Sequence, residues 1–469
     1  MTFDPSYWKN AAREVQTALI ADLIPLLRIE SIREDEKATP EAPFGPGPAE
    51  ALSYMLDMAR RDGFDCENVG NRAAVIRWGK GKTVLGLFAH LDVVPANGTW
   101  TTPAFEPSLR NGRLYGRGTS DDKGPAMACY YALKLVRDAG IVPANMRVDF
   151  ILGTDEESNW ECMDYYLSHQ PRPDLAFSPD ADFPLINGEK GMLNLPLHFS
   201  HQETAEYNLL SFNAGLRINI VPEEATAVLA GDKLRVLAEK FDIFCRREPS
   251  VTGHSSLSDD RLSLTVYGKS AHAMAPDEGV NAATFLAHFL CSAGITNDFL
   301  AFADSRLHLQ SNGASLGIAS HDEIMGNVTV NPGLLCYDES GGDILLDIRF
   351  PRTTNLDRIL SSAKPVLEQS DAEPRAPRHV KEVHYVPADD PLVTTLLDVY
   401  HTHTGLPAKP LSIGGGTYGK LVERGVAFGM TMPGADIVIH APDESLILKD
   451  LETATGIYAD AIARLVTQY

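Results

Sequence analysis

Two pairs of side chains suited to metal binding or proton transfer follow apolar runs of strand length. His90 and Asp92 form a His-x-Asp pair after VLGLFA, residues 84–89, and Glu156 and Glu157 are adjacent shortly after RVDFILG, residues 147–153. A histidine can bind a metal through one ring nitrogen while a nearby carboxylate orients the ring through the other. Of two adjacent acids beside a metal, one can bind the ion and the other can act as general base. Taken singly, each pair is more often a structural hydrogen bond or two solvated acids.

Three further residues complete a possible set of metal ligands. Asp121, in YGRGTSDDKGP, could bridge two cations or cap a helix, Asp180, in FSPDADFP, could belong to a simple turn, and His440, in IHAPDES, could be a core histidine. With His90 and Glu157 they supply two imidazoles and three carboxylates, which leaves the neighbouring glutamate for proton transfer. The mixture favours Zn²⁺, Mn²⁺ or Co²⁺ over Ca²⁺, because imidazole nitrogen prefers transition metals. Two such ions, about 3.5–4 Å apart, would hold one hydroxide and polarise a carbonyl together.

The elements that must position these residues form an alternating pattern. Apolar spacing and helix-end signals predict helices over residues 7–28, 48–63 and 124–140. The runs at 84–89 and 147–153 are continuously apolar, which is typical of strands buried on both faces of a mostly parallel sheet. Strand, helix and strand at this spacing predict a crossover unit of an α/β fold. In such folds the active groups lie just past the carboxyl ends of the strands, where both pairs occur.

A change of pattern in the middle of the chain predicts an inserted domain. Alternating stretches such as LSLTVYG (262–268) and DILLDIRF (343–350) occur there, separated by helical segments. Further on, helix and strand patterns return, with VAFGMTM as a strand candidate. We therefore predict a catalytic domain in two parts, residues 1–190 and 383–469, interrupted by an α+β domain over residues 191–382.

Composition and charge narrow the possible partners and location. The 469 residues include 41 Lys and Arg against 63 Asp and Glu, and the net charge of −22 argues against nucleic acid or an anionic membrane as a partner. The six cysteines include no Cys-x-x-Cys pair, which favours free thiols in a reducing compartment. The first residues do not have the pattern of a secretory signal, and the stretch Ala18 to Leu27 is too short and too polar to cross a bilayer. A cytoplasmic location is predicted.

A series of motifs along nearly the whole chain resembles one family of metallopeptidases. The motifs are AHLDVVP, YGRGTSDDKGP, GTDEES, FSPDADFPLINGEKG, GLRINIVPEEA, YGKSAHAMAPDEGVNA, LDIRFP, GGGTYGK and IHAPDE. In this order they resemble the aminoacylase and carboxypeptidase G-like dinuclear zinc metallopeptidases, in particular the dipeptidase V branch, which is similar to Xaa-His dipeptidases and carnosinases. The resemblance implies an α/β fold, with a zinc-peptidase-like catalytic domain that has a mostly parallel mixed sheet between helices. It also implies an inserted two-lobed α+β lid domain.

The same resemblance implies two divalent metal ions per chain. His90 and Asp180 would bind one ion, and Glu157 and His440 would bind the other. Asp121 would bridge the two ions, and the family pattern implies a cis peptide bond directly after it. Zn²⁺ is the expected metal, with Mn²⁺ and Co²⁺ as alternatives.

Catalytic and substrate-binding roles also follow from the resemblance. Glu156 would act as general base, Asp92 would orient the histidine ring two residues before it, and His272 in SAHAMAP would stabilise the carbonyl oxyanion. Arg349 in LDIRF would bind the substrate's C-terminal carboxylate through two parallel hydrogen bonds. The remaining substrate contacts would come from a lid asparagine and a glycine-rich loop, namely Asn219, Gly415, Gly416 and Thr417.

The residues by themselves leave structural alternatives open for two of these roles. Arg349 could pair with Asp347 or Glu223 instead of a substrate, and His272 could be a packing residue. The insertion is longer than the short lid through which relatives dimerise, so a monomer is predicted.

These assignments predict a metal-dependent dipeptidase that hydrolyses dipeptides with a free amino terminus. An N-acyl amino acid deacylase or a carboxypeptidase of the same family stays open, because the metal motifs do not separate these activities. A non-catalytic metal-binding protein is disfavoured, because a pure binding site would not need Glu156. A phosphate loop in GGGTYGKL is rejected, because Leu421 stands where a Ser or Thr should bind Mg²⁺. A serine hydrolase is unsupported, since no Gly-x-Ser-x-Gly occurs.

Overall fold

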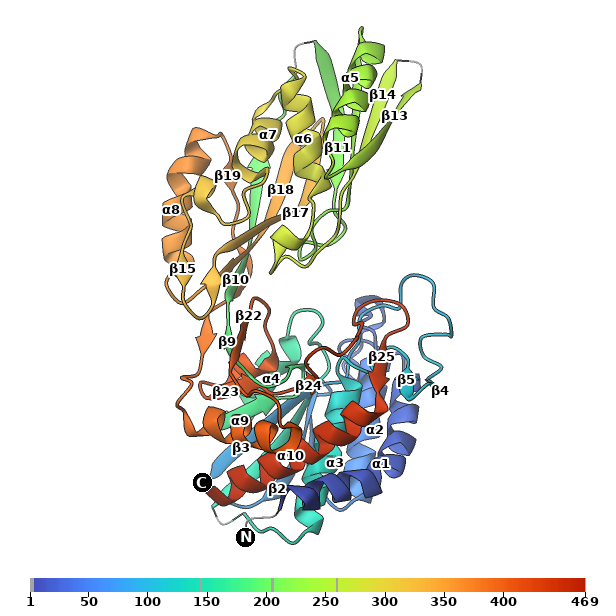
Figure 1. Cartoon of the computed structure of the whole chain (residues 1–469), viewed down its shortest axis with the longest axis vertical. Coiled ribbons are helices and arrows are strands. Elements are labelled where there is room, and N and C mark those ends of the chain that lie inside the picture. The colour runs from blue at the N-terminus through green and yellow to red at the C-terminus, as the bar shows by residue number, and fades with distance from the viewer. Residues whose placement is uncertain (1–3, 144, 204–205, 259, 469) are drawn as a thin grey trace. The chain divides into compact units, whose positions relative to one another are not determined.

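The structure, a computed structural model, describes residues 4–143, 145–203, 206–258 and 260–468. Its contacts divide the chain, drawn in Figure 1, into two units. Unit 1 comprises Met1–Gly188, Tyr385–Leu411 and Gly416–Tyr469, and unit 2 comprises Glu189–His384 and Ser412–Gly415. From the sequence, all of residues 383–469 are predicted to belong to the catalytic domain. In the structure, Ser412–Gly415 belongs to unit 2, to which it is joined by hydrogen bonds. In two of these, Ser412 Oγ donates to Ile324 O at 2.7 Å and Arg349 Nη1 donates to Gly414 O at 3.0 Å.

The main sheet of unit 1 is mixed, with its parallel strands in the centre. The central strand β3 pairs in parallel with β6 on one side and with β7 on the other, and β23 continues the parallel set beside β7. The order along the sheet is β1 (Asp65–Val69), β2 (Ala73–Gly79), β6 (Met146–Gly153), β3 (Thr83–His90), β7 (Leu175–Ser178), β23 (Gly425–Ala427), β9 (Ile186–Glu189) and β21 (His384–Tyr385), with β22 (Leu411–Ile413) beside β9. The two predicted buried strands are therefore β3 and β6, and they lie side by side.

Both faces of this sheet are covered, as the continuous apolar runs predicted. Successive side chains of β6 point to opposite faces of the sheet. Phe150 belongs to a core packed against the long helices, and Ile151 belongs to a smaller core with Trp160 and Tyr418. The long α10 packs against α1 and α3 (Figure 1). The helices are α1 (Pro5–Arg28), α2 (Pro46–Arg61), α3 (Lys123–Asp138), α4 (Glu161–His169), α9 (Pro391–Thr404) and α10 (Leu448–Gln468).

The predicted strand VAFGMTM is interrupted, which corrects that prediction. It forms β23, then breaks at Phe428 and Gly429, and resumes as β24 (Met430–Thr431), which pairs with β8 (Ala181–Asp182). Gly429 has φ +82°, and a Cβ there would lie 2.4 Å from the Phe183 ring. The break therefore needs a residue without a side chain. A third small sheet joins β4 (Ser108–Arg110), β5 (Arg113–Tyr115) and β25 (Ser445–Ile447).

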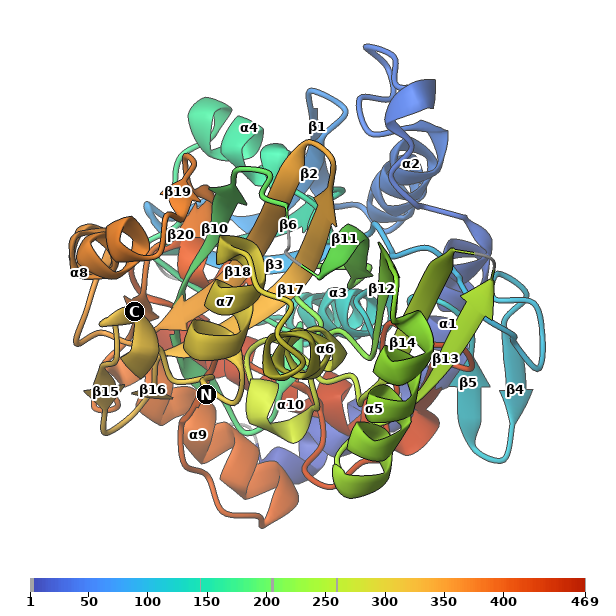
Figure 2. The same ribbon diagram turned by 90° about the horizontal axis from the view of Figure 1, so that it is seen from above.

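Unit 2 is an antiparallel sheet with helices on one face. Along the sheet the strands are β13 (Thr252–Ser258), β14 (Arg261–Tyr267), β12 (Glu224–Gly231), β11 (Tyr207–Ala214), β17 (Thr329–Asp338), β18 (Gly341–Phe350), β10 (Gly191–Phe199) and β19 (Glu373–Pro374). Figure 2 shows helices α5, α6 and α7 covering one face of this sheet. The remaining elements of unit 2 are α5 (Leu234–Arg247), α6 (Ala282–Ser292), α7 (Asp298–Phe302), α8 (Leu356–Gln369), β15 (His321–Asp322), β16 (Gly326–Asn327) and β20 (Arg378–Lys381).

Strand alternation in β18 separates the core of unit 2 from a polar site. Ile348 and Phe350 point into the core under the helices. Asp347 and Arg349 alternate with them and so point from the opposite face, although both are buried. One face of the LDIRF strand therefore packs in the apolar core, and the other face makes polar contacts. Short helical turns complete the chain at Asp35–Lys37, Pro276–Glu278, Ala303–Leu307, Ala314–Leu316 and Tyr418–Leu421.

Candidate metal centre and active site

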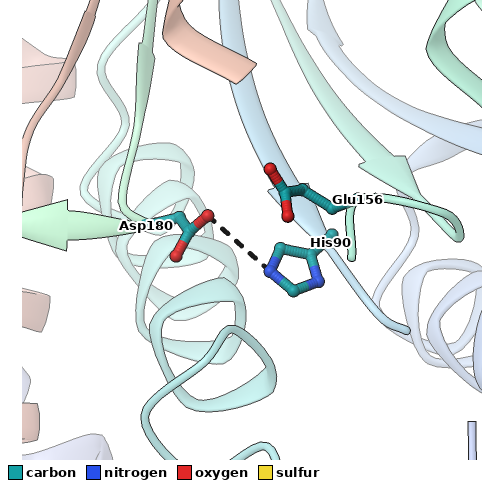
Figure 3. Close-up of side chains that lie close together, drawn as sticks. All are labelled: His90, Glu156 and Asp180. Atoms are coloured by element: carbon teal, nitrogen blue, oxygen red, sulfur yellow. Dashed lines mark ion pairs between the residues drawn. The ribbon is translucent and has the colours of Figure 1, made fainter. Parts of the chain in front are cut away.

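The candidate ligands of unit 1 meet at the carboxyl edge of its central strands. β3 ends at His90 and β6 ends at Gly153, and these two residues are paired in the parallel register. Glu156 follows β6, and Asp180 follows β7, which ends at Ser178. Figure 3 shows the side chains of His90, Glu156 and Asp180 turned toward one another at this edge. The parallel strand order alone brings these three chain segments together, as expected for the carboxyl edge of an α/β sheet.

Asp121 stands between the two candidate histidines. Its Oδ1 lies 3.0 Å from His90 Nε2, and its Oδ2 lies 2.9 Å from His440 Nε2. His440 Nε2 is also 3.0 Å from Glu157 Oε1, and His90 Nε2 is 3.7 Å from Asp180 Oδ2. All five residues predicted as metal ligands are therefore neighbours, although Glu157 and His440 are 283 positions apart in the chain.

The donor atoms fit the binding of divalent transition ions. One ligand atom from each of His90, Asp121 and Glu157 lies within 4.8 Å of the others, and the same holds for His90, Glu156 and Asp180. Mixed imidazole and carboxylate sets of this kind suit Zn²⁺, Mn²⁺ and Co²⁺. Asp121 offers one oxygen to each side, which is the arrangement that a bridging carboxylate needs.

Burial and the crowding of like charges shift the pKa values of this cluster. Burial raises the pKa of Asp180 to about 7, and the charge of nearby Asp121 adds to the shift. Burial also raises the pKa of Glu157, again with a contribution from Asp121. Burial lowers the pKa of His440, but its hydrogen bonds to Asp121 and Glu157 outweigh this and raise it to about 11. Neighbouring carboxylates therefore favour positive charge at this place, and bound cations would supply such charge.

Asp92 organises the site mainly through the loop after β6. Its Oδ1 and Oδ2 accept hydrogen bonds from the backbone N–H groups of Glu156 and Glu157, each at 3.0 Å. The ring Nδ1 of His90 lies 3.0 Å from the Asp92 carbonyl oxygen and 3.5 Å from its carboxylate Oδ1. Asp92 therefore orients the His90 ring chiefly with its backbone carbonyl, while its side chain holds both glutamates in place.

Several residues in direct contact with this cluster had no predicted role. The peptide bond Asp121–Asp122 is cis, as the resemblance implied, and Asp122 Oδ2 accepts a hydrogen bond from His90 N at 2.9 Å. The Tyr418 ring stands edge-on to the His90 ring, with centroids 6.4 Å apart. Glu444 Oε1 accepts hydrogen bonds from Ser120 N and Asp121 N. These residues stand in the motifs YGRGTSDDKGP, GGGTYGK and IHAPDES, but residue type alone did not indicate their contacts.

Two of the predicted substrate residues are neighbours within unit 2. Asn219 O accepts a hydrogen bond from Ala273 N at 2.9 Å, and Ile220 forms an isolated bridge with His272. The ring Nδ1 of His272 accepts a hydrogen bond from Met274 N at 3.1 Å. The neutral His272 ring therefore carries its proton on Nε2, which makes Nε2 a hydrogen-bond donor.

Arg349 forms an ion pair with Asp347, which is one of the alternatives that the sequence left open. Its Nη2 donates to Asp347 Oδ2 at 2.7 Å, its Nε pairs with Oδ1 of the same carboxylate, and Met192 Sδ contacts Nη1. Nη1 also donates to Gly414 O at 3.0 Å, so both N–H groups of Nη1 have partners within unit 2. Of the predicted glycine loop, Gly415 belongs to unit 2, whereas Gly416 and Thr417 belong to unit 1. Thr417 is buried, and its Oγ1 accepts a hydrogen bond from Gly419 N.

Over the part of the chain that the structure describes, no helix has both the length and the apolar character to cross a membrane.

Comparisons with known proteins place the whole chain among peptidases. Residues 86–464 match the family model described as Peptidase family M20/M25/M40. A Beta-Ala-Xaa dipeptidase from Lactobacillus delbrueckii subsp. lactis is 40% identical over 465 residues, which cover 98% of each chain.

Solved structures share the fold at much lower sequence identity. Human carnosine dipeptidase 1 matches with a TM-score of 0.59 and 12% identity, covering 99% of both chains. A dipeptidase from Saccharomyces cerevisiae matches with a TM-score of 0.60 and 11% identity, covering 100% of this chain and 99% of that one. At these identities the two structures establish similarity of fold, including both the mixed α/β part and the inserted α+β part.

Proposed function

The chain belongs to peptidase family M20/M25/M40, and from this membership we propose that it is a metal-dependent dipeptidase acting on dipeptides with a free amino terminus. The membership confirms the resemblance drawn from the motifs, and the α/β fold with its inserted α+β part is also confirmed. The observation that carries the proposal is the position of Asp121 between His90 and His440, with Glu157, Asp180 and a further glutamate beside them.

Two divalent ions are proposed as the cofactor, with Zn²⁺ first and Mn²⁺ or Co²⁺ as alternatives. His90 and Asp180 would bind one ion, and Glu157 and His440 would bind the other. Asp121 would bind both ions. The distances among these side chains support this assignment. Bound there, such ions would supply Lewis acidity to the scissile carbonyl and to a water molecule.

Glu156 is proposed to carry the proton during hydrolysis. Burial raises the pKa of Glu156 well above its ordinary value, and the charges of Asp180 and Glu157 add to this. A carboxyl group with a raised pKa can accept a proton from water and return it to the leaving amine near neutral pH. The hydrogen bond from Glu156 N to Asp92 Oδ1 keeps the residue at the edge of the cluster.

Residues of unit 2 are proposed to recognise the substrate. The Nε2 donor of His272 suits a developing oxyanion, because a preoriented N–H group stabilises such a charge. Arg349 would bind the C-terminal carboxylate with Nη1 in exchange for its contacts to Gly414 O and Met192 Sδ, while Asp347 holds the other side of the guanidinium. The substrate would also be lined by Asn219, Gly415, Gly416 and Thr417. Unit 2 would act as a lid. Because of the long insertion, we propose that the enzyme is a monomer.

A cytoplasmic location is proposed as well. All six cysteines are free thiols, and thiols persist in a reducing compartment. The net charge of −22 also supports small dipeptides as partners over nucleic acid or anionic membranes.

Hydrolysis of a substrate panel tests the proposed activity. Purified enzyme loaded with Zn²⁺, Mn²⁺ or Co²⁺ is given free dipeptides, the matching N-acetyl amino acids, and tripeptides, and the released amino acids are quantified. We expect cleavage of the free dipeptides. Cleavage of the N-acetyl set alone would indicate a deacylase, and cleavage of C-terminal residues from tripeptides would indicate a carboxypeptidase.

The Arg349→Lys variant tests recognition of the substrate carboxylate. A lysine cannot replace both forks of the guanidinium, so we expect kcat/KM for a dipeptide to fall about 10–100-fold, mainly through KM. The dipeptide amide, which lacks the carboxylate, should be cleaved equally slowly by the variant and the parent enzyme. Arg352→Lys is the matched control, because Arg352 pairs with Asp322 in the same unit. An equal loss on acid and amide would show that Arg349 only supports the fold through Asp347.

A further inference from the structure

A buried ion pair joins the loop of Asp121 to the loop of His440. Arg117 Nη1 lies 2.6 Å from Glu444 Oε2, and the two side chains are 1% and 0% exposed. Within the described part of the chain, Arg117 Nε has no hydrogen-bond partner. A buried ion pair contributes little net stability, because the cost of removing both charges from water offsets their attraction, and an unsatisfied donor adds to that cost. The pair is therefore weak evidence of a contribution to fold stability, although Arg117 Nη2 also donates to Pro95 O at 3.3 Å.

The other oxygen of Glu444 holds the backbone that leads into Asp121. Glu444 Oε1 accepts hydrogen bonds from Ser120 N at 2.9 Å and from Asp121 N at 3.3 Å. The carboxylate of Asp121 is the group that faces both His90 and His440. Because these two amides immediately precede that carboxylate, a shift of the amides would displace both of its oxygens.

The same glutamate also restrains the loop that carries His440. Its carbonyl oxygen accepts a hydrogen bond from Gly116 N at 3.0 Å, and the next residue, Ser445, accepts one from Ser120 Oγ at 3.0 Å. On the other side of His440, Ile439 is 50% exposed. His440 itself has φ 57°, a left-handed conformation that a non-glycine residue keeps only when its surroundings hold it. The contacts of Glu444 and Ser445 therefore supply an important part of that restraint.

We propose that Arg117 and Glu444 form a positioning pair that sets Asp121 and His440 in register for the ion that these two residues share with Glu157. The inference rests on the proposed function, because it presumes two metal ions. Arg117 fixes one oxygen of Glu444, so the other stays directed at the amides before Asp121. The ion at His90 and Asp180 depends less on the pair, because His90 ends a central strand.

The double variant Arg117→Leu/Glu444→Met removes the pair without leaving a buried charge alone. We expect it to fold, since hydrophobic replacement of a buried pair is often neutral. The melting temperature of the metal-free protein should fall only by the effect of losing the two backbone hydrogen bonds to Glu444 Oε1. Equilibrium dialysis of metal-free protein against Mn²⁺, followed by elemental analysis, should show two ions in the parent. In the variant we expect the ion shared with Glu157 to bind about 10–100-fold more weakly, and the ion at His90 and Asp180 to be weakened less.

A second ion pair of unit 1 provides the matched control. Arg147 Nε lies 2.6 Å from Asp149 Oδ1 near the start of β6, at the end of the strand opposite to the site. The variant Arg147→Leu/Asp149→Met should therefore bind two Mn²⁺ ions with parental affinity. Loss of the second ion in this control as well would overturn the inference, because it would show a general effect of removing an ion pair.

Other outcomes separate the inference from the proposed function. If Arg117→Leu/Glu444→Met binds both ions with parental affinity, the positioning role is wrong although the dipeptidase proposal stands. If that variant does not fold, Glu444→Gln replaces it; this variant keeps the side-chain shape and should bind the second ion about 10-fold more weakly, and unchanged affinity would overturn the inference. A parent protein that binds no Mn²⁺ and cleaves no dipeptide would reject the proposed function, and the inference with it.

Discussion

Replacing Glu156 by glutamine is expected to reduce kcat for dipeptide hydrolysis about 10²–10⁴-fold while both metal ions remain bound. The amide is nearly the same size as the carboxyl group but cannot accept the proton of water at neutral pH. Glu156 N is held by Asp92 Oδ1 at 3.0 Å, and this backbone contact does not depend on the side chain. The folded site should therefore survive the substitution.

Steady-state kinetics and elemental analysis of the same preparation check this expectation. Glu14→Gln, an exposed position on α1, is the matched control and should leave both measurements unchanged. A Glu156→Gln enzyme with parental kcat would exclude Glu156 as the general base. If kcat falls because the variant has lost its metal, Glu156 acts instead as a ligand, a role compatible with its place beside His90 and Asp180.

Removal of divalent ions by a chelator is expected to abolish hydrolysis and to lower the melting temperature. The carboxylates of Asp121, Glu157 and Asp180 are crowded, and burial raises the pKa of Asp180 to about 7. Ions that bind only the folded protein relieve this repulsion, and each at a hundredfold excess over its Kd contributes about 2.7 kcal/mol. For a protein of this size the combined effect corresponds to a shift of roughly 5–10 °C.

The effect of pH on metal affinity follows from the histidines. Hydrogen bonds to Asp121 and Glu157 outweigh burial and raise the pKa of His440 to about 11, so an ion must displace a proton from this ring to bind. The affinity for Mn²⁺ should therefore fall as the pH is lowered from 8 to 6. Carboxyl groups with a raised pKa, such as that of Asp180, also release protons on metal binding and strengthen the same trend.

Differential scanning calorimetry with and without Mn²⁺ at the two pH values measures both effects. Addition of Zn²⁺, Mn²⁺ or Co²⁺ should restore the melting temperature and the activity, whereas Ca²⁺ should not, because it prefers sites made of oxygen ligands only. Full activity of the chelated protein would contradict the metal-dependent mechanism. An unchanged melting temperature would contradict the placement of the ions among these buried carboxylates.

The amino-acid sequence by itself determined the central elements of the catalytic part and the types of residue at its edge. The runs at 84–89 and 147–153 are β3 and β6 with one additional residue at the start of each and one at the end of β3. Such runs are recognisable because burial on both faces demands apolar side chains at consecutive positions. The position of His90 at the end of one strand, and of Glu156 and Glu157 just after another, then followed from the ordinary geometry of α/β sheets.

Contacts between distant segments were decided only by the tertiary structure. The carboxylate of Asp92 binds the amides of Glu156 and Glu157, and Glu157 lies beside His440. Local patterns do not encode such contacts, because each depends on how strands and loops pack after folding. The break of VAFGMTM at Gly429 has the same origin, since it is the packing of Phe183 that excludes a side chain there.

The pairing of Arg117 with Glu444, 327 positions apart, is the clearest case of this division. Both residues stand in motifs that the sequence singled out, but the sequence indicated no role for either. Folding buries them together because β5 and β25 pair next to the loops that carry Asp121 and His440. The sequence thus determined which side chains are present at each strand end and loop. Their burial and mutual distances, which give these side chains their chemistry, arose only when the sheet and its loops assembled.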